Sequence, residues 1–152
     1  MAYCTQSDVE DACGGAARLL QLSDWDRNGA VDAARVAKAI DRASSLIDSF
    51  AVKRYAVPIN PIPAVIVSHA ADLAMLFLAK GRGMLTQDQQ ELWTSIAGTD
   101  ENNPGWLLLL ARGTVSLGVD PVPTASSMVV DQVATTLPLE RDMSRDKSGG
   151  FW

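Results

Sequence analysis

The chain has 152 residues, of which 47% are hydrophobic and 20% are charged, so its length and composition predict one domain with one core. Its formal net charge of -5 excludes the clustered basic surface that specific nucleic-acid binding requires, and its longest apolar runs are shorter than the roughly 20 residues that span a bilayer. The N-terminus lacks an export signal, and the two cysteines have neither the spacing nor the density of a disulfide framework. We therefore expect a soluble protein with reduced thiols and with no nucleic-acid or membrane partner.

The first half of the chain is predicted to form two short helices and one long helix. Thr5 or Ser7 is suited to cap a helix through "DVEDACGG", and "AARLLQL" follows as a second. Asp32 is the candidate N-cap of a run that contains neither glycine nor proline and continues to Tyr55. Apolar residues in this run recur at spacings of three and four, so they form one stripe toward a core or a neighbouring subunit: Val36, Ile40, Ala43, Ile47 and Phe50.

The second half begins with a proline-rich elbow, "YAVPINPIP", where helix propagation must stop. Pro63 suits the first turn of the next helix, "PAVIVSHAADLAMLFLAKG", which is apolar on nearly every side and therefore central. Thr86 and Gln89 form a capping-box pattern at the start of "TQDQQELWTSIAG", and the polar break "GTDENNPG" separates that helix from "WLLLLARG". We expect residues 1–123 to form an all-α core of four or five helices.

Residues 124–152 have a different composition, with few core formers and a mixed-charge end, and are predicted to form an extended C-terminal arm. Within the arm, residues 128–133 include a β-branched stretch that could form one short strand, which would need a partner edge from another chain. Aromatic side chains are enriched at the anchor points of interfaces. We therefore interpret four residues near the end as a docking element for a neighbouring chain, the alternative being a disordered end: Arg141, Arg145, Phe151 and Trp152.

Residues 24–35, "DWDRNGAVDAAR", begin like a calcium-binding EF-hand loop. Oxygen-bearing side chains fall at its first, third, fifth and ninth places: Asp24, Asp26, Asn28 and Asp32. The twelfth place, which requires a bidentate glutamate, holds Arg35. We therefore interpret the loop as a turn in which Asp24 and Asp32 cap helices and Gly29 takes a positive φ, and we expect no metal and no cofactor. The alternative is a calcium-responsive helical binding module built on residues 24–35, whose melting temperature would rise with calcium.

Arg54 and Tyr55 end the long helical run beside the proline elbow. One interpretation is that Arg54 anchors the last free carbonyls of that helix. The alternative is an interface in which Arg54 pairs with an acid such as Asp48 of a neighbouring subunit. Neither interpretation gives these residues a catalytic role.

His69 is the only histidine, and it stands in the apolar helix with Asp72 three residues on. A catalytic or metal site would need a second ligand or a positioned serine or cysteine, and no such residue stands at a spacing that would combine with His69. We interpret His69 as a satisfied core histidine and expect no enzymatic activity.

Two stretches carry a resemblance to a known family. Residues 39–58 follow the pattern A-I-D-x-A-S-x-x-I-D-S-F-x-x-x-R-Y-x-V-P, and residues 141–151 follow R-x-x-S-R-D-x-x-x-G-F. With these stretches the chain resembles the Mu-like phage head-to-tail joining family, small neck connector proteins that complete the phage head. It departs from the family at "AGTDENNPG", where the family has continuous helix, and at Met143, where the family has an aromatic residue.

The resemblance implies a structural virion protein, mostly helical, that forms a ring, twelve-fold in the family, between the portal and the tail of a tailed bacteriophage. The implied partners are further copies of the chain, the portal protein, and a tail or neck protein of the same phage. DNA would pass through the ring without specific binding. The implied location is the neck of the virion, reached from the host cytoplasm during assembly, and the C-terminal arm is expected to reach along neighbouring subunits or the adjoining neck protein.

Overall fold

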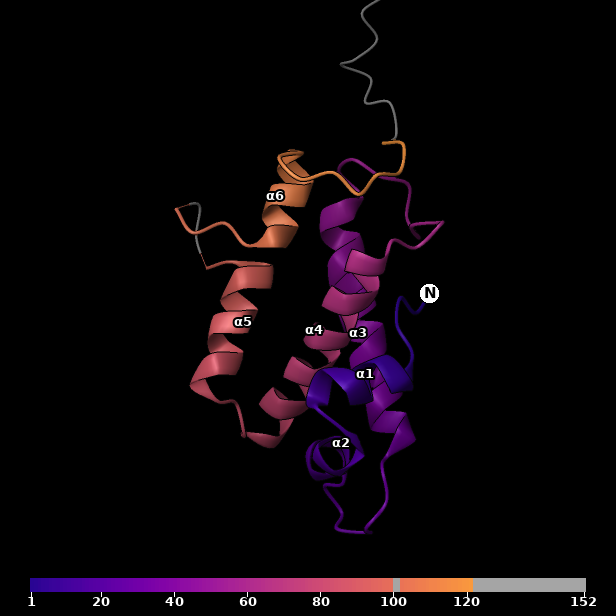
Figure 1. Cartoon of the computed structure of the whole chain (residues 1–152), viewed down its shortest axis with the longest axis vertical. Coiled ribbons are helices and arrows are strands. Elements are labelled where there is room, and N and C mark those ends of the chain that lie inside the picture. Colours follow the sequence, from indigo (N-terminus) through magenta and orange to yellow (C-terminus); the bar gives the residue numbers. More distant parts are fainter. Residues whose placement is uncertain (100–101, 122–152) are drawn as a thin grey trace, which may run out of the picture.

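The computed structural model describes residues 1–99 and 102–121, and these residues form six helices and no strand (Figure 1). The helices are α1 (Gln6–Cys13), α2 (Ala16–Ser23), α3 (Ala33–Ala51), α4 (Ala64–Arg82), α5 (Gln87–Ala97) and α6 (Trp106–Arg112). The all-α prediction is therefore confirmed, with six helices in the described ranges where four or five were expected. The predicted arm, including the stretch at 128–133, lies outside the described residues, so the division after residue 123 stays a prediction.

The helix α4 lies at the centre of the fold, as its composition predicts. It packs against α1, α2, α3 and α5, and its most extensive contact is with α3, which runs alongside it (Figure 1). By length and composition α4 is also apolar enough to cross a membrane, with a mean hydropathy of 1.5. Half of that apolar window is buried inside the fold. The central position explains why so much of the helix is apolar, since it packs against four neighbouring helices.

The helix α3 begins where the sequence predicts and ends earlier. The side chain of Asp32 accepts the backbone N–H of Arg35 at 3.1 Å, which makes Asp32 the N-cap. The helix stops at Ala51, whose carbonyl accepts the N–H groups of both Arg54 and Tyr55 at 2.9 and 2.8 Å. The predicted continuation to Tyr55 is therefore wrong, because the chain turns there and directs Tyr55 into the interior, where it is only 4% exposed.

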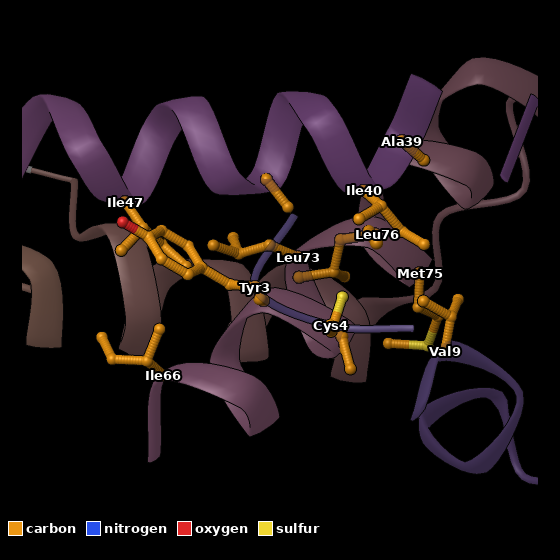
Figure 2. Packing of buried hydrophobic residues seen from close by; sticks show 14 of the residues in the cluster. Tyr3, Cys4, Val9, Ala39, Ile40, Ile47, Ile66, Leu73, Met75 and Leu76 are labelled. Carbon is orange, nitrogen blue, oxygen red and sulfur yellow. The ribbon is translucent and has the colours of Figure 1, made fainter. Parts of the chain in front are cut away.

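The core is built by α3, α4 and the N-terminal segment. Of the predicted apolar stripe on α3, all but Phe50 are buried, and Phe50 is partly buried against the same core. Figure 2 shows the ring of Tyr3 beneath α3, near Ile47, with Leu73 of α4 close by. The residues with the largest fully buried side chains come from most of the helices and from the elbow after α3: Leu19, Leu22, Ile47, Ile59, Ile66, Leu73, Leu76, Ile96, Leu107 and Leu110.

The helices α5 and α6 are separated by the predicted polar break. The capping box at the start of α5 is confirmed, since Thr86 and Gln89 each accept the other's backbone N–H, at 3.4 and 3.1 Å. At the break, the N–H of Thr99 donates to the carbonyl of Asn103 at 3.3 Å, and the backbone of Gly105 lies directly against Gly98. This tight closure places α6 next to α5 (Figure 1).

Candidate interaction site

The Asp-rich loop between α2 and α3 is closed by hydrogen bonds within the protein. The two carboxylate oxygens of Asp24 accept the N–H groups of Asn28 and Gly29, both at 2.8 Å, and Gly29 has a φ of 74°. These backbone bonds lower the pKa of Asp24. Arg35 donates from Nε to Asp32 at 2.6 Å and from Nη2 to Asp26 at 3.0 Å. The Arg35 guanidinium therefore binds carboxylate oxygens of Asp26 and Asp32, two of the four candidate metal ligands.

We expect millimolar calcium to leave the melting temperature of the protein unchanged, because Arg35 brings a positive charge to the carboxylates that would have to bind the ion. The measurement is a thermal melt with calcium chloride, compared with magnesium chloride at equal ionic strength and with a chelator. As a control, Asp24→Ala should lower the melting temperature by the same amount with and without calcium. A rise that is specific to calcium and reversed by the chelator would contradict this expectation and support the calcium-responsive module.

Asp48, a predicted interface residue, is engaged by the protein's own N-terminal segment. The hydroxyl of Tyr3 donates to the Asp48 carboxylate and accepts the N–H of Ile59 at 2.9 Å. The N–H of Tyr3 donates to the Ser44 hydroxyl at 3.1 Å. Burial, and then the bond to Asp48, raise the pKa of Tyr3 to about 12. The hydroxyl of Tyr3 thus joins the N-terminus, α3 and the proline elbow at one point.

We expect the free energy of unfolding to fall as pH rises from about 9 to about 12. Burial raises the pKa of Cys4 and Cys13 from 9.0 to about 11 and that of Tyr3 from 10.0 to about 12. Above pH 9 the unfolded chain therefore binds fewer protons than the folded chain, and stability is lost as pH increases. Urea unfolding across this range measures the slope. Tyr3→Phe should reduce the slope between about pH 10 and 11, where the cysteines still contribute, and remove it above about pH 11. A stability independent of pH would contradict the assignment.

Arg54 and Tyr55 contact the end of α6 and the segment after it. The Arg54 guanidinium lies over Gly113, and its Nη1 donates to the carbonyl of Arg112 at 3.5 Å. The hydroxyl of Tyr55 accepts the N–H of Leu117 at 3.2 Å. Arg54 does anchor a helix C-terminus, where a cation is favoured, but this helix is α6 and not α3 as the sequence suggested. An additional pairing of Arg54 with Asp48 of a neighbouring subunit stays a prediction, and so does an interface role for Tyr55.

Replacing Gly113 with alanine should destabilise the protein more than the same change at Gly83. Both glycines end helices with a positive φ, 79° and 70°, so both substitutions should cost about 1 to 2 kcal/mol of backbone strain. A Cβ at Gly83 would meet nothing within 4 Å, whereas one at Gly113 would collide with the Arg54 guanidinium. We expect Gly113→Ala to lose about 0.5 to 1 kcal/mol more in urea unfolding. In an Arg54→Ala background the two losses should be equal, and a difference that persists there would contradict the proposed anchor.

The side chain of His69 is partly buried and packs against an aromatic ring. Its ring centroid lies 4.4 Å from that of Trp106, the first residue of α6, at an interplanar angle of 49°. Burial lowers the pKa of His69 and raises that of Asp72. His69 was expected to be a satisfied core histidine, but its Nδ1 has no hydrogen-bond partner among the described residues. The arrangement joins α4 to α6 by packing.

A row of stacked cations and aromatic rings is the feature that the sequence did not indicate. Arg42 of α3 lies over the ring of Phe77 at 4.9 Å, and Phe77 meets the edge of Trp93 of α5 at 5.6 Å. Lys80 lies 5.7 Å from the same Trp93 ring, and Arg35 lies 4.3 Å over Trp25. Cation–π contacts of this kind join groups from three helices and the Asp-rich loop. Spacing on α3 puts its cations on one face, but no local pattern pairs Arg42 with a ring more than thirty residues away.

Comparison with known proteins gives the chain a family. The family described as "Bacteriophage Mu, Gp36" matches residues 3–133. The chain belongs to this family. It is also 33% identical over 101 residues to "Mu-like prophage FluMu protein gp36" of Haemophilus influenzae, an alignment that covers 66% of this chain and 65% of that relative. The chain thus spans slightly less than two thirds of the relative's length.

Membership of the Mu Gp36 family shows that the protein is phage-associated. The family match includes one of the two stretches that carried the resemblance. Residues 39–58 fall inside the matched range, and they form the second half of α3, the turn and the first part of the elbow. The C-terminal stretch lies beyond residue 133. The predicted docking residues of the arm lie outside both the matched range and the described residues: Arg141, Arg145, Phe151 and Trp152.

Proposed function

We propose that the protein is a structural component of the virion, an adaptor that forms a ring between the portal and the tail of a tailed phage. The observation that carries this proposal is the match to the Mu Gp36 family over residues 3–133, which includes the 39–58 pattern. The resemblance to head-to-tail joining proteins supplies the specific role. The ring, its location in the neck after assembly in the host cytoplasm, and its partners, a portal protein and a tail or neck protein, follow from that role.

The geometry of the 39–58 region supports a role in assembly. Hydrogen bonds connect the second half of α3 and the turn after it to three other parts of the chain. The Tyr3 hydroxyl binds Asp48 of α3 and Ile59 of the elbow, and Arg54 and Tyr55 of the turn bind the end of α6 and the segment after it. These contacts link the N-terminal segment to residues more than forty positions away, and they should restrain the region against local rearrangement. A ring subunit needs such rigidity, since its contacts must repeat with the same geometry around the axis. The mechanism we propose is interlocking of surfaces, without an enzymatic step.

The net charge is consistent with a channel for DNA. At -5 the chain carries a surplus of carboxylates, and a ring of such subunits would weakly repel the phosphate backbone. A duplex could then pass without adhering. The charge supports the proposal only together with the family match, because many soluble proteins share its sign.

The C-terminal arm has a proposed role in holding neighbours together. Its last residues include two arginines and two aromatic side chains of the kind that anchor interfaces: Arg141, Arg145, Phe151 and Trp152. We propose that the arm reaches a neighbouring subunit or the adjoining neck protein. Deleting residues 140–152 should therefore weaken ring formation and prevent tail joining while the folded body remains intact by circular dichroism. Normal joining by the truncated chain would remove this role.

Inactivating the gene in the phage that encodes the chain tests the joining function. We expect lysates that contain DNA-filled heads and free tails that are not joined, with joining restored when the chain is supplied from a plasmid. A plasmid that carries Gly105→Ala, a variant expected to fold poorly, serves as the negative control. Joined, infectious particles in the absence of the chain would overturn the proposal.

A further inference from the structure

One face of the protein carries a groove lined by cations and aromatic rings, which we call the cation groove. It lies between α3 and α4, has a volume of about 240 Å³, and is lined also by Trp25 and Phe77. Lys38 and Arg42 of α3, which are exposed, form its rim, and the buried Ala39 and Leu78 form its floor. Asp41, the neighbour of Arg42 in the sequence, lines an adjoining hollow and not the groove itself.

The charges on this rim are not neutralised within the described part of the chain. Both ion pairs in residues 1–99 and 102–121 use Arg35, which is already held by Asp26 and Asp32. Lys38 and Arg42 are exposed and form no ion pair there, and Arg42 lies over an aromatic ring instead. A groove with an apolar floor and free cations at its rim suits a partner that brings carboxylates on a narrow ridge.

The helix α1 has this chemistry. It carries Asp8, Glu10 and Asp11 within eight residues and no basic side chain. Asp8 is held by the Thr5 cap, whereas Glu10 and Asp11 form no ion pair within the described residues. Asp8 and Asp11 line a hollow together with Asp72 of α4, and Glu10 lies on α1 outside that hollow. We call the acidic residues of α1 and this hollow the α1 face.

The cation groove and the α1 face lie at different levels of α4. On this helix the hollow beside α1 is lined by Val67, Ser68, Ala71 and Asp72, and the groove by Phe77, Leu78 and Gly81. The middles of the two sets are about nine residues apart, which is about 14 Å along the helix. Both surfaces are fixed on the same helix, so one chain cannot bring its own α1 face to its own groove. A contact between them has to join two copies.

We propose that copies of this chain associate head to tail, with the α1 face of one copy seated against the cation groove of the next. A contact between two different patches repeats from copy to copy and closes into a ring when the rotation between subunits permits. This inference deepens the proposed function, on which it rests for the ring itself. It assigns the ring contact to Lys38 and Arg42 on one side and to Glu10 and Asp11 on the other.

Charge reversal tests the contact. Association is measured by sedimentation velocity at low ionic strength and at protein concentrations up to the millimolar range. The groove variant combines Lys38→Glu with Arg42→Glu, and the α1 variant combines Glu10→Lys with Asp11→Lys. A control variant, Arg27→Glu with Lys53→Glu, applies the same change in net charge as the groove variant at exposed positions outside both surfaces. The α1 variant also places cations in the last turn of α1, where they are favoured, so it should fold normally.

We expect the native chain to associate, and each of the two variants to associate at least about tenfold more weakly, while the control changes much less. An equimolar mixture of the groove and α1 variants should regain association, because each then meets a partner of opposite charge. A chain that carries all four substitutions should associate with itself. Added salt should weaken every one of these contacts, because exposed charges are screened.

The proposal is overturned if the native chain stays monomeric at millimolar concentration, if the groove variant behaves like the control, or if the mixture does not regain association. These outcomes are distinct from failure of the proposed function. Complementation of the inactivated phage gene measures the joining of heads and tails directly. If the chain is needed for joining but its copies associate through other residues, the adaptor role stands and only the proposed contact is wrong.

Discussion

Gly105→Ala is expected to lower the free energy of unfolding by about 3 kcal/mol or more. A Cβ on Gly105 would collide with backbone atoms of the preceding helix end, including the Ile96 carbonyl oxygen at 2.6 Å, and backbone atoms cannot move aside as a flexible side chain can. The substitution should therefore separate α6 from α5 and expose Leu107 and Leu110, which are fully buried. Urea unfolding followed by circular dichroism measures the loss.

Gly81→Ala is the matched control for this prediction. A Cβ on Gly81 would lie 2.8 Å from the ring of Trp25, so its obstacle is a side chain that is 42% exposed and not the backbone. Alanine is also favoured over glycine within a helix by about 1 kcal/mol, which offsets the movement of the ring. We expect Gly81→Ala to be nearly neutral. A loss at Gly105 no larger than that at Gly81 would mean that the break between α5 and α6 opens freely.

Tyr3→Ala should cost about 4 kcal/mol, because Tyr3 is 2% exposed and its removal leaves a cavity beneath α3. The substitution also deprives the buried Ile59 N–H of its acceptor. Tyr3→Phe separates the two contributions, since it keeps the ring and removes the hydroxyl, and should cost about 1 to 3 kcal/mol. Thermal and urea unfolding of the pair check this order. If Tyr3→Phe were as stable as the native chain, the hydroxyl would not join the N-terminus to α3 and the elbow as described.

The helix boundaries that could be predicted from the sequence are those fixed by residues a few positions apart. Asp32 and Thr86 cap helices as expected, and of the two candidates at the first helix, Thr5 and not Ser7 is the cap. Such caps can be predicted because they need only a side-chain oxygen and an N–H three residues on. The failure at the end of α3 has a non-local cause. Tyr55 leaves the helical path to lie in the interior and accept the N–H of Leu117, a partner that is 62 residues away and cannot be found from local pattern.

The same distinction separates the site predictions. The Asp-rich loop could be judged from its twelve residues, since the departure at Arg35 is itself part of the pattern and the structure places Arg35 against Asp26 and Asp32. By contrast, the role of Tyr3 was missed, because nothing near residue 3 indicates a bond to Asp48. The cation groove was missed for the same reason, since its cations and its aromatic rings come from separate elements.

A reconstruction by cryo-electron microscopy of the neck of the tailed particle whose genome encodes this chain tests the adaptor role most directly. The account predicts a helical ring between the portal and the tail, into which the six helices and the arm of this chain can be traced. The ring should place the α1 face of each subunit at the cation groove of the next. A neck that is fully resolved and contains no density that this chain fits would contradict the adaptor role.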